Sequence, residues 1–151
     1  MGYATPDTLS DAVACLGSGQ PSIVAGGTDF FPALGDRPAP ADIVDISRIA
    51  ELGRITLSGQ GWRIGAAVRW RDIIKAGLPA GFDALKLAAR EVGSLQIQNA
   101  GTVAGNLCNA SPAADGVPPL LTLEARVELA SASGRRELAL AEFITGEVAF
   151  P

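Results

Sequence analysis

Residues 101–115 form the segment that most constrains this chain. They read Gly-Thr-Val-Ala-Gly-Asn-Leu-Cys-Asn-Ala-Ser-Pro-Ala-Ala-Asp and combine small residues with two amides, three hydroxyl or thiol groups and one carboxylate. Glycine has no Cβ, so a segment that opens with it lets backbone N–H groups approach an anionic ligand closely. We interpret this stretch as a glycine-rich loop that contacts a ligand.

A segment of the same chemical kind, Ile-Val-Ala-Gly-Gly-Thr-Asp-Phe, occupies residues 23–30. A predicted strand delivers its C-terminal end to the glycine pair, where backbone N–H groups can face a pyrophosphate and the Thr28 hydroxyl adds a donor. The first glycine is Gly26 in one segment and Gly101 in the other, and an acidic residue follows the glycines in both segments. Together they predict one long ligand held from two sides. Phosphates and a hydroxylated sugar would suit them, which makes a dinucleotide the natural candidate.

Structural roles compete with this interpretation. A Gly-Gly pair also suits a simple tight turn, and this one has neither the Lys-Ser/Thr pair of a Walker A loop nor a Gly-x-Gly-x-x-Gly fingerprint. Asp29 can cap a following helix. Asn106 and Asn109 can bond the backbone of their own loop, and Ser111 or Asp115 can cap the helix expected after it. The residues alone favour a ligand only slightly.

Composition narrows the class of function. A net charge of −4 and a pI near 4.7 argue against nucleic acids and anionic membranes as partners. No run of apolar residues is long enough to span a membrane, and the N-terminus lacks the pattern of a signal peptide, so we expect a cytoplasmic protein. The absence of histidine removes Ser-His and Cys-His catalysis, and two cysteines cannot hold an iron–sulfur cluster. We expect neither a metal site nor a catalytic residue in the chain.

The remaining chemically notable side chains have mostly structural interpretations. We expect Cys15 to be a small core residue, and Cys108 to contact a ligand by packing at most. A disulfide between them is not expected in a reducing compartment. Trp62 and Trp70 are interpreted as packing residues of the core or of a lobe interface rather than as a flavin stack.

Periodicity and turn residues predict an α+β chain in two lobes. Helices are predicted at residues 8–16, 69–76, 79–92 and 117–125, strands at 22–25 and 42–46, and hairpins at 55–68 and 126–138. A small N-terminal lobe would cover residues 1–53 and a larger lobe residues 54–151.

These residues resemble a known family. The run Ala-Gly-Gly-Thr-Asp at residues 25–29 and the run at residues 101–121 look like the flavoprotein (medium) subunit of molybdenum hydroxylases, a family that includes the xanthine dehydrogenase and carbon monoxide dehydrogenase types. Supporting matches are Tyr3, Pro6, Leu9 and residues 44–47, 64–66, 92–93 and 97–99. The resemblance covers nearly the whole chain.

The resemblance implies a two-lobed FAD-binding domain of the vanillyl-alcohol-oxidase (PCMH) type. The first segment would wrap the pyrophosphate, the second would meet the other side of the cofactor, and Asp115 would hold a ribose. The implied FAD-binding residues are Val24, Ala25, Gly26, Gly27, Thr28, Asp29, Phe30, Gly101, Thr102, Gly105, Asn106, Cys108, Asn109 and Asp115. The chain departs from the family pattern at Ala100, where a basic residue is common, and at Ala104, where glycine is frequent.

By the same resemblance, the chain is an electron-transfer subunit that is not active alone. Substrate would be hydroxylated at a molybdenum cofactor on a large subunit. Electrons would then pass through a 2Fe-2S small subunit to FAD here, and on to NAD, oxygen or a quinone. The family's C-terminal domain is expected to be absent, because the sequence stops at Pro151. The alternatives are a truncated, non-redox nucleotide-binding or assembly module, and a free-standing FAD oxidoreductase resembling the cell-wall reductases of this fold.

Overall fold

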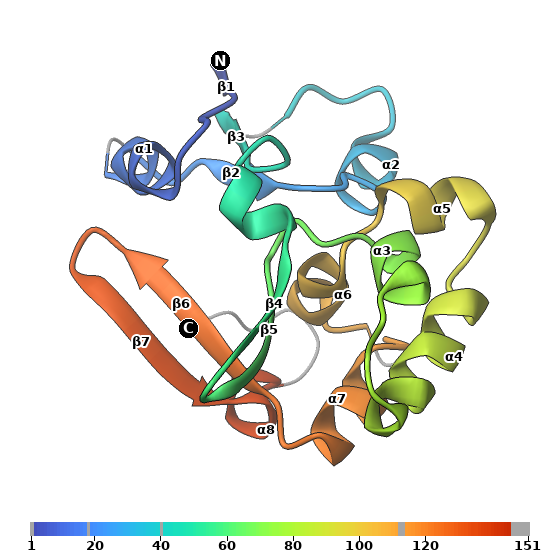
Figure 1. The fold of residues 1–151 in the computed structure, drawn as a ribbon. Helices are drawn as coiled ribbons and strands as arrows, with labels where there is room; N and C mark the ends of the chain where they lie inside the picture. Colours follow the sequence, from blue (N-terminus) through green and yellow to red (C-terminus); the bar gives the residue numbers. More distant parts are fainter. Residues whose placement is uncertain (1, 18, 40, 112–113, 146–151) are drawn as a thin grey trace.

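The computed structural model describes residues 2–17, 19–39, 41–111 and 114–145. A small parallel sheet with two helices forms one end of the molecule, and two hairpins and the remaining helices form the rest (Figure 1). The mixture of helices and antiparallel hairpins confirms the predicted α+β class. The C-terminal boundary of the predicted domain, and Pro112 and Ala113 within the second motif, lie outside the described residues.

The N-terminal sheet has three parallel strands in the order β1-β3-β2. These are β1 (Tyr3–Ala4), β2 (Ser22–Val24) and β3 (Ile43–Asp45), connected by helices α1 (Leu9–Leu16) and α2 (Phe30–Leu34). Thr8 caps α1 by accepting a hydrogen bond of 3.1 Å from the backbone N–H of Asp11, as its position before the helix predicts. Strand β1 was not predicted, because two residues carry no periodicity and only pairing with β3 defines them.

Two antiparallel hairpins follow the predicted positions. They are formed by β4 (Ile55–Ser58) with β5 (Gly61–Ile64), and by β6 (Arg126–Ser131) with β7 (Gly134–Ala139). The short helices η1 (Ala50–Gly53) and α8 (Leu140–Phe143) precede the first hairpin and follow the second. The first hairpin ends at Ile64 rather than at residue 68, because the chain then turns at Gly65 and Ala67 donates a 2.9 Å hydrogen bond to the carbonyl of Leu52.

Like α1, the other three predicted helices form close to their expected bounds. They are α3 (Trp70–Lys75), the pair η2 (Ala80–Phe82) and α4 (Asp83–Glu91), and α7 (Val117–Thr122). Leu85 and Ala89 are fully buried on the apolar face of α4. Pro118 and Pro119 lie in the first turn of α7, where the N–H groups that proline lacks would have no helical partner.

The prediction of a continuous glycine-rich loop after α4 is wrong. Residues in this stretch form α5 (Leu95–Ala100) and α6 (Val103–Asn109). Thr102 caps α6 by accepting a 3.0 Å hydrogen bond from the N–H of Gly105, and Val103 and Leu107 pack into the core. A cap, the buried Val103 and the partly buried Leu107 outweigh the poor helix propensity of glycine and asparagine.

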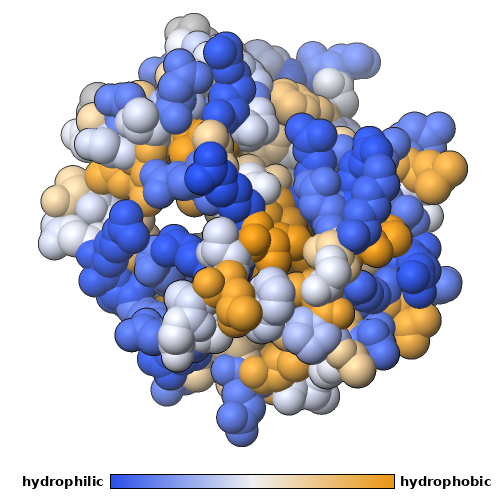
Figure 2. All heavy atoms as spheres, in the orientation of Figure 1, coloured by the Kyte–Doolittle hydropathy of each residue, from blue (hydrophilic) through white to orange (hydrophobic). Residues whose placement is uncertain are grey.

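Two hydrophobic clusters stabilise the fold. The larger one includes Trp70, which is 1% exposed, and Trp62 packs its ring edge-on against Phe82 at 6.0 Å between centroids. Both tryptophans therefore have the packing roles predicted for them. Figure 2 shows hydrophobic residues gathered near the middle of this face, with hydrophilic residues around them.

The smaller cluster lies beside the parallel sheet and joins Val44, Ile49 and Leu52 to Ala67 of the following segment. Cys15 packs against it, as expected of a small core residue, and the two cysteines are not joined in a disulfide. We propose that the two lobes divide after residue 53, with residues 65–68 reaching back to the smaller cluster.

Candidate cofactor site

The two glycine-bearing segments meet in space. A Cβ added to Gly26 would overlap the carbonyl group of Ala100 and lie 2.9 Å from the Cα of Gly101, so only glycine fits there. The Thr28 hydroxyl also lies at this contact, 3.3 Å from the position that a Cβ on Gly101 would occupy. The fold therefore brings together the two segments that the sequence analysis singled out.

A short backbone ladder fixes the second segment against the start of α3. The N–H of Trp70 donates to the carbonyl of Gly101 at 3.1 Å, and the N–H of Val103 donates to the carbonyl of Val68 at 3.1 Å. These bonds make an isolated antiparallel bridge between Arg69 and Thr102. The bridge places the first residues of α3 and α6 side by side.

A cleft of about 250 Å³ opens where these segments converge. Its walls come from the β2–α2 turn, the end of β3, the segment before α3, and the junction of α5 and α6. The lining residues are Ala25, Gly26, Ser47, Ala67, Arg69, Asn99, Ala100 and Thr102. Small-molecule pockets usually measure about 300–1,000 Å³, so this cleft suits one part of a dinucleotide rather than all of it.

The lining chemistry suits an anionic or strongly polar ligand. It offers the hydroxyls of Ser47 and Thr102, the amide of Asn99, the guanidinium of Arg69 and several peptide groups. Among the described residues that line the cleft there is no carboxylate. A donor set of this kind fits the pyrophosphate of FAD or the polar edge of its ring system.

Asp45 holds Ser47 in place at the end of β3. One oxygen of its carboxylate accepts the backbone N–H of Ser47 at 2.9 Å, and the other accepts the Tyr3 hydroxyl at 2.8 Å. Burial acts to raise the pKa of Asp45, but hydrogen bonds from Ser47 and Tyr3 and the charge of Arg48 bring that pKa below its ordinary value. Asp45 is therefore ionised at neutral pH. The hydrogen bond to this carboxylate is the main cause that raises the pKa of Tyr3.

The predicted residues of the first segment divide into two groups. Ala25 and Gly26 line the cleft, with Thr28 directly beside it. The others support the turn. Val24 is buried in β2, Gly27 has φ +66° with the Phe31 ring packed where its Cβ would stand, and Phe30 meets Phe31 edge-on. Asp29 is exposed at the start of α2 and makes no side-chain cap there.

The second segment presents its polar residues on one side of a helix. Thr102, Gly105, Asn106 and Asn109 recur at the spacing of one helical face, although the segment was predicted as a loop. Of the predicted residues in this segment, Thr102 lines the cleft and Gly101 adjoins it, whereas Gly105, Asn106 and Asn109 lie outside its lining. Gly105 and Asn109 are exposed.

Asn106 has a structural partner. Its side-chain oxygen accepts the backbone N–H of Gly116 at 3.1 Å, which ties α6 to the start of α7. A backbone N–H can only donate, so this bond orients the amide and leaves its NH₂ group as the free donor end. The alternative that Asn106 bonds nearby backbone is therefore correct for one end of the side chain.

The last two predicted residues are Cys108, in the last turn of α6, and Asp115, shortly before the start of α7. Cys108 is exposed as a residue, yet desolvation of its sulfur raises the thiol pKa, so the group is a neutral thiol at neutral pH. Asp115 is exposed. The capping position of α7 is Gly116, which has no side chain to make a cap bond, rather than the expected Asp115 or Ser111.

Sequence reasoning missed Ser47, Arg69 and Asn99 as lining residues. Ser47 carried a local signal, since an Asp-x-Ser run after a strand favours a turn in which the carboxylate accepts the serine N–H. Arg69 carried no local signal, because only its bridge to Thr102 brings it to the cleft.

Comparison with known proteins identifies related chains. Residues 1–149 match the family described as FAD binding domain in molybdopterin dehydrogenase. The chain is 38% identical over 150 residues to the nicotinate dehydrogenase FAD-subunit of Eubacterium barkeri, covering 96% of this chain and 51% of that subunit. It is 37% identical over 150 residues to the xanthine dehydrogenase FAD-binding subunit of Escherichia coli O157:H7, covering 95% and 51% respectively.

The fold is also similar to that of a solved dehydrogenase structure. The structure superposes on that of reconstituted CO dehydrogenase from Oligotropha carboxidovorans with a TM-score of 0.90 at 27% identity, covering 100% of this chain and 55% of that chain. The chain thus spans about half the length of the curated relatives it matches. Within the described residues, no helix is long and apolar enough to cross a bilayer.

Proposed function

The chain belongs to the family of FAD-binding domains in molybdopterin dehydrogenases, and on this premise we propose that it is the flavin-carrying, electron-transferring part of a molybdenum-containing hydroxylase. Its relatives are FAD-containing subunits of dehydrogenases, including the xanthine and nicotinate types. The observation that carries the proposal is the cleft at which the Gly26 turn meets residues 100–102. We assign the two-lobed architecture to the PCMH type.

Hydrogen bonds from the cleft and from residues near it would position the cofactor. The backbone around Ala25 and Gly26 would face the pyrophosphate, with Thr28 as a nearby hydroxyl donor. Thr102 uses its oxygen as the cap of α6, so its own O–H is what remains for a ligand. Asn106 would offer its amide NH₂ group, and Asp115 would accept from ribose hydroxyls. Bound FAD would supply the redox chemistry, and the protein would hold and tune it.

The proposed partners are a large subunit with the molybdenum cofactor and a small subunit with 2Fe-2S clusters. The similarity to chains named as subunits of larger dehydrogenases supports this division of labour. The chain itself contains no histidine and two cysteines, which suits a subunit that carries only the flavin. We propose that electrons arrive from the small subunit and leave to an external acceptor.

The test is the visible absorption spectrum of the purified chain, followed by acid release and identification of the bound cofactor. We expect flavin bands and released FAD, or uptake of FAD after addition. A chain that is folded by circular dichroism, is colourless and does not take up added FAD would contradict the proposal. It would favour the non-redox module considered above.

A further inference from the structure

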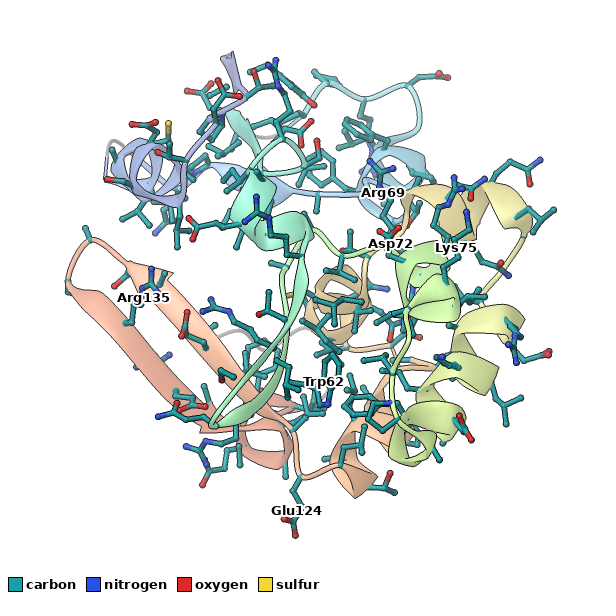
Figure 3. All side chains as sticks on the ribbon, in the orientation of Figure 1. Trp62, Arg69, Asp72, Lys75, Glu124 and Arg135 are labelled. Carbon is teal, nitrogen blue, oxygen red and sulfur yellow. The ribbon has the colours of Figure 1, made fainter. Side chains whose placement is uncertain are left out.

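Arg69 is distinguished by its charge within the cleft. Among the described lining residues it alone carries a charge, whereas the other polar groups are hydroxyls, an amide and peptide groups. It precedes α3, and its bridge to Thr102 fixes its backbone. Figure 3 shows Arg69 at the end of α3 that faces α2, with Asp72 and Lys75 farther along the helix.

The guanidinium of Arg69 contacts no acid or hydrogen-bond acceptor within the part of the chain that the structure describes. Arg63, Arg126 and Arg135 make ion pairs with glutamates on the hairpins, but among the described residues the Arg69 side chain makes neither an ion pair nor a hydrogen bond. Asp72, the nearest acid along the helix, accepts the backbone N–H of Arg69 at 3.1 Å rather than its side chain. The cation is therefore available to a ligand.

We propose that Arg69 is the residue that neutralises the diphosphate of FAD. The inference rests on the proposed FAD site and adds a binding residue to it. A diphosphate is anionic, and neutral donors such as Ser47 and Thr102 can bond its oxygens without balancing that charge. A guanidinium does both, because its planar N–H groups match two phosphate oxygens at once.

The net negative charge of the chain supports this assignment. With 16 acidic and 12 basic residues, the protein repels anions on average, so a diphosphate needs a local cation. Arg69 lies on the same cleft as the Gly26 turn, which is the proposed phosphate-facing backbone. The geometry therefore combines backbone donors on one wall with a positive charge on another.

The test compares Arg69→Gln with the matched variant Arg71→Gln, which removes an arginine in the first turn of α3 that does not line the cleft. Three probes are titrated: FAD, ADP, which has the diphosphate without the flavin, and riboflavin, which has no phosphate. Arg69→Gln should weaken FAD and ADP binding about 10- to 100-fold, as loss of a charged hydrogen bond predicts. Riboflavin binding should not change, and Arg69→Lys should restore part of the FAD affinity.

The dependence of FAD affinity on ionic strength gives a second test, because it would not change if Arg69 had only a structural role. The FAD affinity of the wild type should fall with ionic strength more steeply than that of Arg69→Gln. Equal FAD affinities in Arg69→Gln, Arg71→Gln and wild type would overturn the inference while leaving the FAD site standing. An equal loss for riboflavin and FAD would also overturn it, since the residue would then act on the flavin or on the fold. A wild type that binds no FAD would instead contradict the proposed function itself.

Discussion

The hydroxyl of Tyr3 donates a 2.8 Å hydrogen bond to the carboxylate of Asp45, 42 residues later in the chain. The other oxygen of the same carboxylate holds the backbone N–H of Ser47, a lining residue of the cleft. A side chain in the first strand is therefore connected through one carboxylate to the wall of the candidate cofactor site.

This connection predicts different effects for its two members. Asp45→Asn removes the charge that anchors Ser47, so we expect FAD to bind more weakly and the unfolding free energy to fall by an amount on the order of 1 kcal/mol. Tyr3→Phe removes only the phenol bond and should reduce stability without changing FAD affinity. Fluorescence titration with FAD measures the affinity of each variant, and urea unfolding measures its unfolding free energy. An FAD affinity that is unchanged in Asp45→Asn would contradict a role of Asp45 in the site.

The ionisation of Asp45 predicts a pH dependence of stability. Its pKa in the folded protein lies below the ordinary value of 3.8, so the unfolded chain takes up the proton first as the pH falls. The stabilisation is complete above the unfolded value and is lost as the pH falls through the folded pKa. The difference in unfolding free energy between wild type and Asp45→Asn should therefore shrink as the pH falls from neutral to below the ordinary carboxyl pKa of 3.8. A difference that stays constant in urea titrations over this range would contradict the assignment.

The close approach at Gly26 predicts a steric effect. Gly26→Ala places a methyl group into the Ala100 carbonyl, so the turn and α5 must separate. We expect a loss of about 1–3 kcal/mol in unfolding free energy, together with weaker FAD binding. Gly53→Ala is the matched control, because no atom lies within 4 Å of its added Cβ. Thermal unfolding of both variants checks the prediction, and equal stability of the two would refute it.

Asp115 provides a test of the proposed ribose contact. Its side chain is exposed and does not cap α7, so Asp115→Ala should leave thermal unfolding unchanged. FAD affinity should fall about 3- to 10-fold if a ribose hydroxyl loses its acceptor. Asp36→Ala, which removes another exposed acid, is the control. Unaltered FAD affinity in Asp115→Ala would remove this residue from the site.

The sequence predicted those parts of the fold that have strong local signals. Thr8 and Gly17 bracket α1, two prolines open α7, and Gly134 turns the last hairpin. The helix at residues 103–109 was missed because its glycine and asparagines outweighed a visible cap at Thr102. Its residues were nevertheless singled out by their chemical groups and by the family resemblance, neither of which depends on whether the segment is a loop or a helix.

The composition of the cleft could be predicted only in part. Gly26 and Thr102 belong to recognisable runs, so the sequence singled them out. Arg69 is exposed, follows a hairpin and resembles any surface arginine in sequence. Its place depends on the pairing of segments 33 residues apart, 69 and 102, and such pairing has no local signature.

The strand order of the N-terminal sheet sets a sequence of events during synthesis. The middle strand, β3, is the last of the three to leave the ribosome, so β1 and β2 have no partner until residues 43–45 emerge. The cleft additionally needs residues 99–102, which are made much later. The strands that support the cleft are therefore synthesised before the cleft is complete, because residues 99–102 close it from a much later part of the chain.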